Sequence, residues 1–272
     1  MAPDNGFSMA ATKAALRACR DCGVTQILMT VWGDDGGECS KYAVAPALLY
    51  AAESCSGEPE PDRLKKRFRE IMGVSYEDWM LLDQMLMPNS GRHINDPSKY
   101  LIYNDVFSGL LDHRCALEDD AYYAALSGKL RAVGETGAYG YLFDKYIALC
   151  DLLAVKASLG LRTRMAYQAG DRKALEELAQ TRYPLAIGKM EAFYRAFRAE
   201  WFRENKPHGF DVHDVRLGGS IRRLKSCQER ILDYLAGEIF VIEELEESML
   251  PEDIGTLWWS RMYTANAVSQ AF

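Results

Sequence analysis

The residues best placed to do chemistry follow a short apolar run near the N-terminus. The stretch ILMTVWGDDGGECS, residues 27–40, passes from aliphatic side chains into Trp32, Asp34, Asp35 and Glu38. In α/β enzymes the active site lies at the C-terminal ends of the strands. A flat aromatic ring can cover the C–H face of a pyranose while neighbouring carboxylates accept hydrogen bonds from its hydroxyls. The pattern predicts a sugar-contacting loop, and an acidic loop whose glycines only serve turn geometry is the alternative.

Two other constellations favour structural roles. Cys19 and Cys22 have a C-x-x-C spacing, but no second cysteine pair stands at metal-ligand spacing, so we expect packing residues and no metal site. His208 and His213 in KPHGFDVHD could belong to a site loop. A connection between helices is the favoured alternative, with Asp214 available to cap the next helix.

Three later polar segments also have simple explanations. Residues 216–220, RLGGS, lack the preceding strand and the following Lys-Ser/Thr of a phosphate loop. The glutamates between residues 243 and 247 are explained as a solvated face near a helix end. Asn104 and Asp105 are candidates for a sugar site if the helical part of the chain reaches one, and capping of a helix is the favoured alternative.

The elements that must position these residues are mostly helices, because apolar residues recur with a period close to 3.6. The expected helices span residues 8–22, 44–54, 61–72, 76–87, 119–133, 139–167, 171–204 and 215–249. Gln26 to Val31 instead forms a continuous β-branched and apolar run, which is typical of a strand buried on both faces. The predicted fold is mainly α, with a small N-terminal α/β unit that contains one buried strand.

A lone strand needs neighbours, because its backbone donors and acceptors must be paired. Those neighbours must come from residues that this chain does not contain, or from another chain. We place the α/β segment in residues 1–56 and the helical domain in residues 57–272. A strand with bare edges and exposed apolar faces is an association hazard, so we expect dimers or larger assemblies.

Composition excludes several classes of function. The chain has 272 residues, 49% hydrophobic residues and a formal net charge of -7, which indicates one large or two unequal domains and argues against nucleic-acid binding. No segment has the apolar length of a membrane helix, and the first residues lack the order of a signal peptide, so we expect a cytoplasmic location without membrane contact. Seven irregularly spaced cysteines indicate reduced residues rather than a disulfide framework.

Three separated motifs resemble one enzyme family. TKAALRACRDCGVTQILMTVWGDDGGE is similar to the end of the catalytic barrel of family 20 glycoside hydrolases, the exo-β-N-acetylhexosaminidases. The closest likeness is to the bacterial subgroup whose eighth strand ends in W-G-D-[DN]-G-x-E. LIYNDVFSGLLD, the block from KPHGFDVHDV to FVIEELEE, and WWSRMYTANAVS resemble the helical C-terminal domain of that subgroup. The resemblance implies that residues 1–56 end a (β/α)8 barrel and that residues 57–272 form its helical C-terminal domain.

The resemblance also assigns roles to three residues. Trp32 would match the Trp that forms one wall of the pocket for the terminal N-acetylglucosamine. Asp34 would match the acidic residue that hydrogen-bonds the outer hydroxyls of the sugar, usually O4 and O6. Glu38 lies in the same motif and would have a supporting role in substrate binding.

One departure from the family pattern limits what this chain can do alone. Family members use an adjacent Asp-Glu pair on the fourth barrel strand: the Glu protonates the glycosidic oxygen, and the Asp orients the 2-acetamido group, whose carbonyl oxygen is the nucleophile. This sequence contains no Asp-Glu dipeptide and nothing that resembles strands one to six. We therefore predict a C-terminal fragment without catalytic residues or a cofactor, inactive alone, whose intact form acts on N-acetylglucosamine-containing glycans.

The competing hypothesis is a non-enzymatic helical module. Its function would be to form a homodimer or to dock onto a separate barrel chain, and Trp32 would then only pack.

Overall fold

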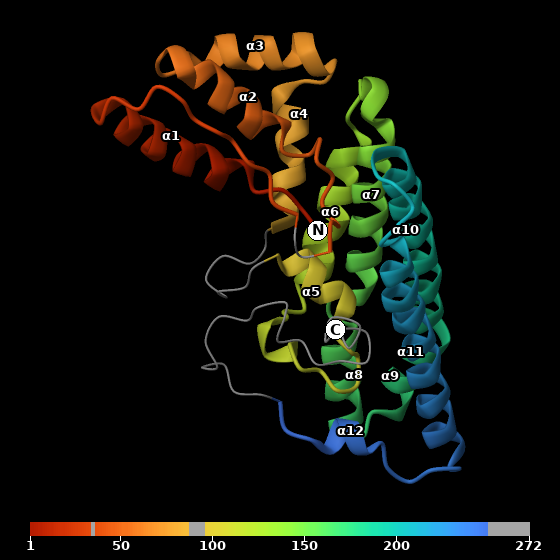
Figure 1. Cartoon of the computed structure of the whole chain (residues 1–272). Helices are drawn as coiled ribbons and strands as arrows, with labels where there is room; N and C mark the ends of the chain where they lie inside the picture. Colours follow the sequence, from red (N-terminus) through yellow and green to blue (C-terminus); the bar gives the residue numbers. More distant parts are fainter. Residues whose placement is uncertain (34–35, 87–95, 250–272) are drawn as a thin grey trace.

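The computed structural model describes residues 1–33, 36–86 and 96–249, and it is mainly α as predicted (Figure 1). An elongated body forms most of the described chain. Its main helices are α6 (Asp119–Arg131), α7 (Gly140–Lys156), α10 (Tyr183–Glu204) and α11 (Phe210–Ala236). Helix α7 packs between α6 and α10, and α11 lies along α10. This body buries the large aromatic side chains of the core, which include Tyr103, Tyr123, Tyr146, Tyr183, Phe193 and Phe197.

A smaller group of helices lies at one end of this body. It consists of α1 (Asn5–Asp21), α2 (Ala45–Glu53), α3 (Pro61–Met72) and α4 (Tyr76–Met80), followed by the 3₁₀ turn η2 (Leu81–Leu86). Helix α3 has the predicted bounds, because Glu60 caps its first turn and Gly73 ends it at a φ of 70°. Helix α1 begins earlier than predicted, since the Asp4 side chain accepts a hydrogen bond from the Phe7 amide and caps the helix.

The predicted buried strand does not form. Residues 24–33 have no regular secondary structure, and the described residues contain no strand with which they could pair. Their apolar side chains are exposed, from 44% for Met29 to 86% for Leu28. The physical reason is the lack of partners in the described part of the chain, because an extended segment becomes a buried strand only where neighbouring strands and covering layers are present.

Several helix boundaries differ from the expected ones. The predicted helix 139–167 breaks after α7, and the chain continues as α8 (Leu159–Gln168). The predicted helix 215–249 ends at Gly237, whose φ of 80° closes α11, and only α12 (Glu243–Glu246) follows. The predicted helix 171–204 is α9 (Arg172–Glu177), a π-helical turn (Leu178–Arg182) and α10. Helix α5 (Pro97–Tyr103) was not predicted.

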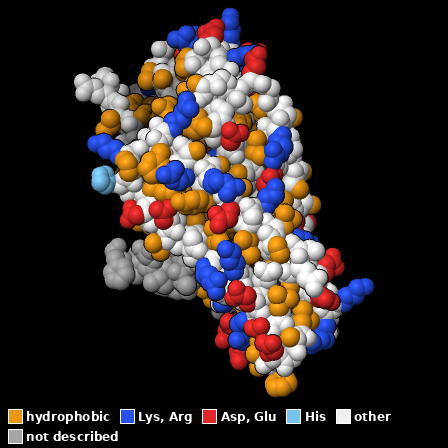
Figure 2. Space-filling model, turned by 90° about the vertical axis from the view of Figure 1, so that its right-hand side faces the viewer, with side chains coloured by type: hydrophobic (Ala, Val, Ile, Leu, Met, Phe, Trp, Pro, Cys, Tyr) orange, Lys and Arg blue, Asp and Glu red, His pale blue; other side chains and the backbone are white. Residues whose placement is uncertain are grey.

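The surface has mixed charge. On the face seen in Figure 2, basic and acidic side chains are interspersed with apolar ones. Such a mixture is typical of solvated helix faces. No helix within the described ranges is long and apolar enough to cross a membrane.

Asp83 connects η2 to α1 and should make stability depend on pH. Its carboxylate accepts hydrogen bonds from Asn5 Nδ2 at 2.7 Å and from the Gly6 amide at 3.0 Å. Burial disfavours the charged form and raises the pKa of Asp83 from 3.8 to about 6. The folded state therefore holds this proton more tightly than the unfolded state, and the free energy of unfolding falls as pH rises through this window.

Between pH 3.8 and about 6, the free energy of unfolding of the unaltered chain should fall by about 2–3 kcal/mol relative to that of Asp83→Asn. Urea unfolding at a series of pH values measures the difference between the two chains. A difference that stays constant with pH would contradict the assignment.

Candidate functional site

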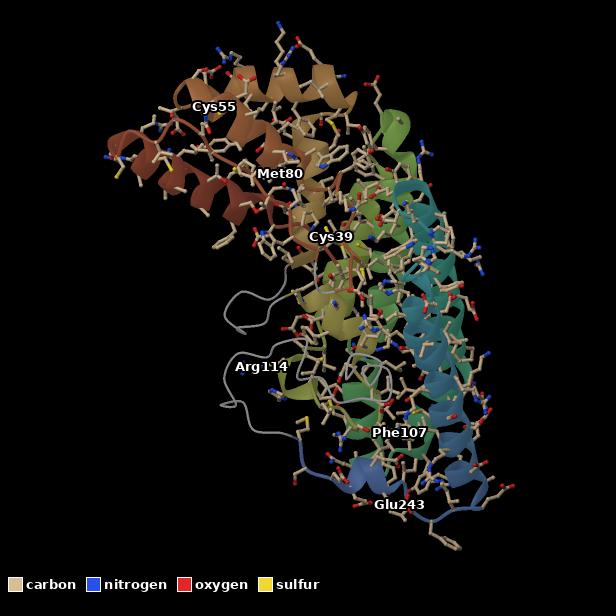
Figure 3. All side chains as sticks on the ribbon, viewed as in Figure 1. Cys39, Cys55, Met80, Phe107, Arg114 and Glu243 are labelled. Atoms are coloured by element: carbon tan, nitrogen blue, oxygen red, sulfur yellow. The ribbon has the colours of Figure 1, made fainter. Side chains whose placement is uncertain are left out.

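The C-terminal half of the acidic loop in the opening motif is bound into the helical body. Residues 36–40 contact side chains of α5, α7, α10 and α11. Cys39 lies where the loop enters this body (Figure 3). Ser40 Oγ donates to Glu204 at 2.7 Å, and Glu204 also accepts a hydrogen bond from Tyr141 Oη at 2.9 Å. Burial raises the pKa of the Cys39 thiol, which keeps it protonated.

Glu38 is the centre of a buried ionic cluster. Its side chain is 1% exposed, and Lys99 Nζ lies 2.7 Å from Oε2. Tyr103 Oη donates to Oε1 at 3.3 Å, and Arg216 Nη1 lies 3.6 Å from the same oxygen. Burial, together with the Glu38 charge, raises the pKa of Tyr103 well above its usual value, so the hydroxyl remains a donor. The carboxylate binds the loop to α5 and α11, so the Glu38 side chain faces protein rather than an open sugar pocket.

A second buried pair holds the backbone of the same loop. Lys145 on α7 is fully buried, and its Nζ donates to the Glu38 carbonyl at 2.5 Å and to Glu200 Oε1 at 2.7 Å. The ammonium also lies 5.0 Å from the centre of the Phe197 ring. Burial raises the pKa of Glu200 to about 7, against the opposing effect of Lys145.

The structure places two of the three predicted substrate-binding residues, Trp32 and Glu38, in different environments. Trp32 is 80% exposed, and its indole N–H donates to Thr30 Oγ1 at 2.8 Å. Glu38 lies inside the helical body, as described above. Asp34 lies outside the described residues.

Asn104 and Asp105 are committed to the fold. Asp105 accepts hydrogen bonds from the amides of Phe107 and Ser108, both at 2.9 Å, and from Arg223 Nε at 2.6 Å. Burial acts to raise the pKa of Asp105, but these donors outweigh it and lower the pKa. Asn104 Nδ2 donates to Asp112 at 2.8 Å. Both residues are 7% exposed, so they organise a turn and do not face an open site.

The remaining candidates also have structural positions. His213 lies in the first turns of α11, which begins at Phe210, so Asp214 does not cap the helix; it accepts a hydrogen bond from Tyr194 at 2.7 Å. Cys19 and Cys22 are free thiols. Within residues 1–33, 36–86 and 96–249, no group of histidine, cysteine or acidic side chains could hold a metal ion.

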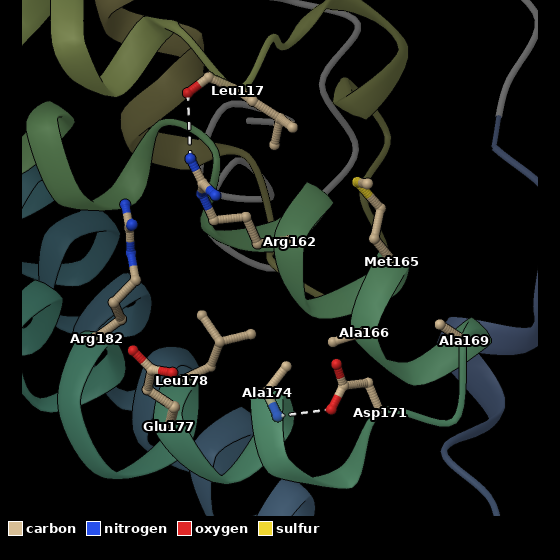
Figure 4. A pocket seen from close by; sticks show the side chains of 10 residues that line it. All are labelled: Leu117, Arg162, Met165, Ala166, Ala169, Asp171, Ala174, Glu177, Leu178 and Arg182. Carbon is tan, nitrogen blue, oxygen red and sulfur yellow. Dashed lines mark hydrogen bonds between the residues drawn. The ribbon is translucent and has the colours of Figure 1, made fainter.

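A hollow of about 400 Å³ lies between α8, α9 and the π-helical turn, and Figure 4 shows its lining. Apolar side chains such as Leu117 and Leu178 line part of it. Its two arginines already have acceptors: Arg182 donates to Asp120 at 2.5 Å, and Arg162 donates to the Leu117 carbonyl at 3.3 Å. Nothing in this lining indicates chemistry related to the loop.

Sequence reasoning missed the cations of the buried cluster. Lys145 stands between Leu142 and Leu149 on the apolar stripe of its helix. A lysine on a buried stripe needs an acceptor, so this position was a usable signal. No comparable signal marked Arg216, because His213 and Ser220, three residues before it and four after it on the same helix face, are polar.

The described part of the chain is a helical domain that encloses one acidic loop. Residues 77–256 match the family described as Glycoside Hydrolase 20C C-terminal domain. The match covers more than half of the chain, so the chain belongs to this family. A comparison with curated proteins found no match.

Proposed function

We propose that this chain contributes one wall of the sugar site of a glycoside hydrolase that removes terminal β-linked N-acetylhexosamine with retention. The 2-acetamido carbonyl of the substrate would be the nucleophile in this reaction. The Asp-Glu pair that the reaction needs would come from barrel residues outside this sequence, and the 272 residues alone would be inactive.

The observation that carries the proposal is the connection between two parts of the chain. The family match lies in the helical domain and begins after the W-G-D-D motif. The loop that follows this motif is nevertheless bound to that domain through Glu38, which contacts Lys99 and Arg216. An exposed indole immediately before an anchored acidic loop supports a role in stacking on a sugar ring.

The test is hydrolysis of a chromogenic N-acetyl-β-glucosaminide. We expect no hydrolysis by the 272-residue chain and turnover by the same chain joined to a complete barrel that carries the Asp-Glu pair. Hydrolysis by the 272-residue chain itself would mean that its own residues include the catalytic acid, and the mechanism proposed here would be wrong.

Trp32→Ala in the barrel-completed enzyme should lower kcat/KM by about 30-fold, because one ring face covering a sugar is worth about 2 kcal/mol. Trp32→Phe keeps an aromatic face, so its kcat/KM should fall much less. In the 272-residue chain, where Trp32 is 80% exposed, neither substitution should change the melting temperature. Full activity of Trp32→Ala would favour the alternative in which this residue only packs.

The alternative function, a helical docking or dimerisation module, has one observation in its favour. Residues 27–31 expose apolar side chains without a strand neighbour. We propose that this segment binds the remainder of the barrel. A second possibility is a homodimer that forms through residues 27–31 or through the long helices. Light scattering at micromolar concentration tests this: a monomer would count against association. We also propose that the intact protein acts on N-acetylglucosamine-containing glycans in the cytoplasm.

A further inference from the structure

The two described ends of the acidic loop are joined by a backbone hydrogen bond. The Gly37 amide donates to the Gly33 carbonyl at 2.9 Å. Gly33 directly follows Trp32, so whatever holds Gly37 also limits where the indole can lie. Gly36 and Gly37 have φ values of 100° and 65°, a conformation that favours glycine and lets the chain turn back on itself.

Two side chains of the helical domain hold this turn. His213 Nε2 lies 2.9 Å from the Gly36 carbonyl. A carbonyl only accepts, so Nε2 carries the proton of this hydrogen bond. The Trp201 ring packs against Gly37 so closely that a Cβ added there would lie 3.4 Å from it. Trp201 and His213 also contact each other, with ring centres 5.0 Å apart.

We propose that His213 is a positioning residue for the sugar-stacking indole: it holds Gly36, and through the Gly37–Gly33 hydrogen bond it fixes Trp32. This inference rests on the proposed function for the role of Trp32, but not for the contact itself. The helical domain would then determine the shape of one wall of the sugar site without touching the substrate.

The environment of His213 suits a permanent donor. Burial lowers the pKa of His213, which opposes a change of charge near neutral pH. Its ring is held edge-on by Phe197 and Trp201 at 4.9 and 5.0 Å between ring centres. A donor fixed by packing on two sides can hold a carbonyl in one place better than a flexible surface side chain can.

Two substitutions separate the hydrogen bond from ring packing. His213→Phe keeps a ring and removes the donor, whereas His213→Gln offers an amide N–H near the position of Nε2. The exposed His208 gives the matched control, His208→Phe. Amide hydrogen exchange in the 272-residue chain should be at least about 10-fold faster at Gly37 in His213→Phe, close to unaltered in His213→Gln, and unchanged in α7.

The second readout is the split between KM and kcat in the barrel-completed enzyme. Loss of a fixed wall should raise KM about 10-fold with kcat nearly unchanged in His213→Phe, because the wall contacts ground state and transition state alike. His213→Gln should restore KM. Unchanged exchange at Gly37, an unchanged KM, or equal defects in both variants would overturn the inference. The exchange experiment needs no substrate, so failure of the proposed function and failure of this contact are separate results.

Discussion

Glu38→Ala is expected to lower the free energy of unfolding by about 3–5 kcal/mol, because it removes the carboxylate that faces two buried cations. Lys99 Nζ lies 2.7 Å and Arg216 Nη1 lies 3.6 Å from this carboxylate. The side chains of Lys99 and Arg216 are 3% and 4% exposed, so water cannot replace Glu38 at either of them. Urea unfolding followed by circular dichroism measures the loss.

Two further variants define what the charge contributes. Glu38→Gln keeps the size and one acceptor oxygen but removes the charge, so its loss should fall between those of the unaltered chain and Glu38→Ala. Glu229→Ala removes an exposed carboxylate 3.5 Å from Arg222, and it should cost less than about 1 kcal/mol. If Glu38→Ala cost no more than Glu229→Ala, other groups would have to neutralise the cluster.

The helical architecture was predictable because local pattern and packing agree over most of the chain. Helix α3 (Pro61–Met72) has the predicted bounds, since its caps are written in adjacent residues. The break between α7 and α8 was not predictable from neighbouring residues. It is stabilised by Asp120, far away on α6, which accepts hydrogen bonds from the amide and the hydroxyl of Ser158 at 3.0 and 2.5 Å. Contacts of this kind override local helix preference.

The candidate site was predictable only in part, for a related reason. The order of Trp32 and the acidic residues is local, so the motif could be read directly from the sequence. The surroundings of Glu38 depend on α5, α7 and α11, which bring Lys99, Lys145 and Arg216 together from distant positions. The buried strand was wrongly expected because a β-branched run indicates burial only if partner strands exist.

Lys145→Met should destabilise the chain by about 3–5 kcal/mol well above pH 7, because it leaves Glu200 buried without its cation. Glu200 is 3% exposed and lies 2.7 Å from Lys145 Nζ. The substitution also removes the donor to the Glu38 carbonyl, which holds the backbone of the acidic loop. Thermal and urea unfolding measure the loss, and the exposed Lys173 gives the control Lys173→Met, which should be near neutral.

The cost of Lys145→Met should depend on pH with a defined sign. Burial raises the pKa of Glu200 from 4.5 to about 7. Below that value the folded state carries a neutral Glu200, so removing Lys145 leaves no buried charge and the loss is smaller. Above pH 7, the variant must either bury an ionised Glu200 without a cation or keep Glu200 protonated at a pH where the unfolded chain would release the proton. Both cost free energy, so the stability lost in Lys145→Met grows as pH rises.

The double variant Lys145→Met/Glu200→Gln tests the same point by a second route. It removes both charges while it keeps similar volumes, and replacing a buried pair by neutral groups is often close to neutral in stability. We therefore expect it to recover most of the loss, short of the hydrogen bond to the Glu38 carbonyl. A double variant as unstable as Lys145→Met, at every pH, would mean that Lys145 stabilises the fold by holding the loop and not by neutralising Glu200.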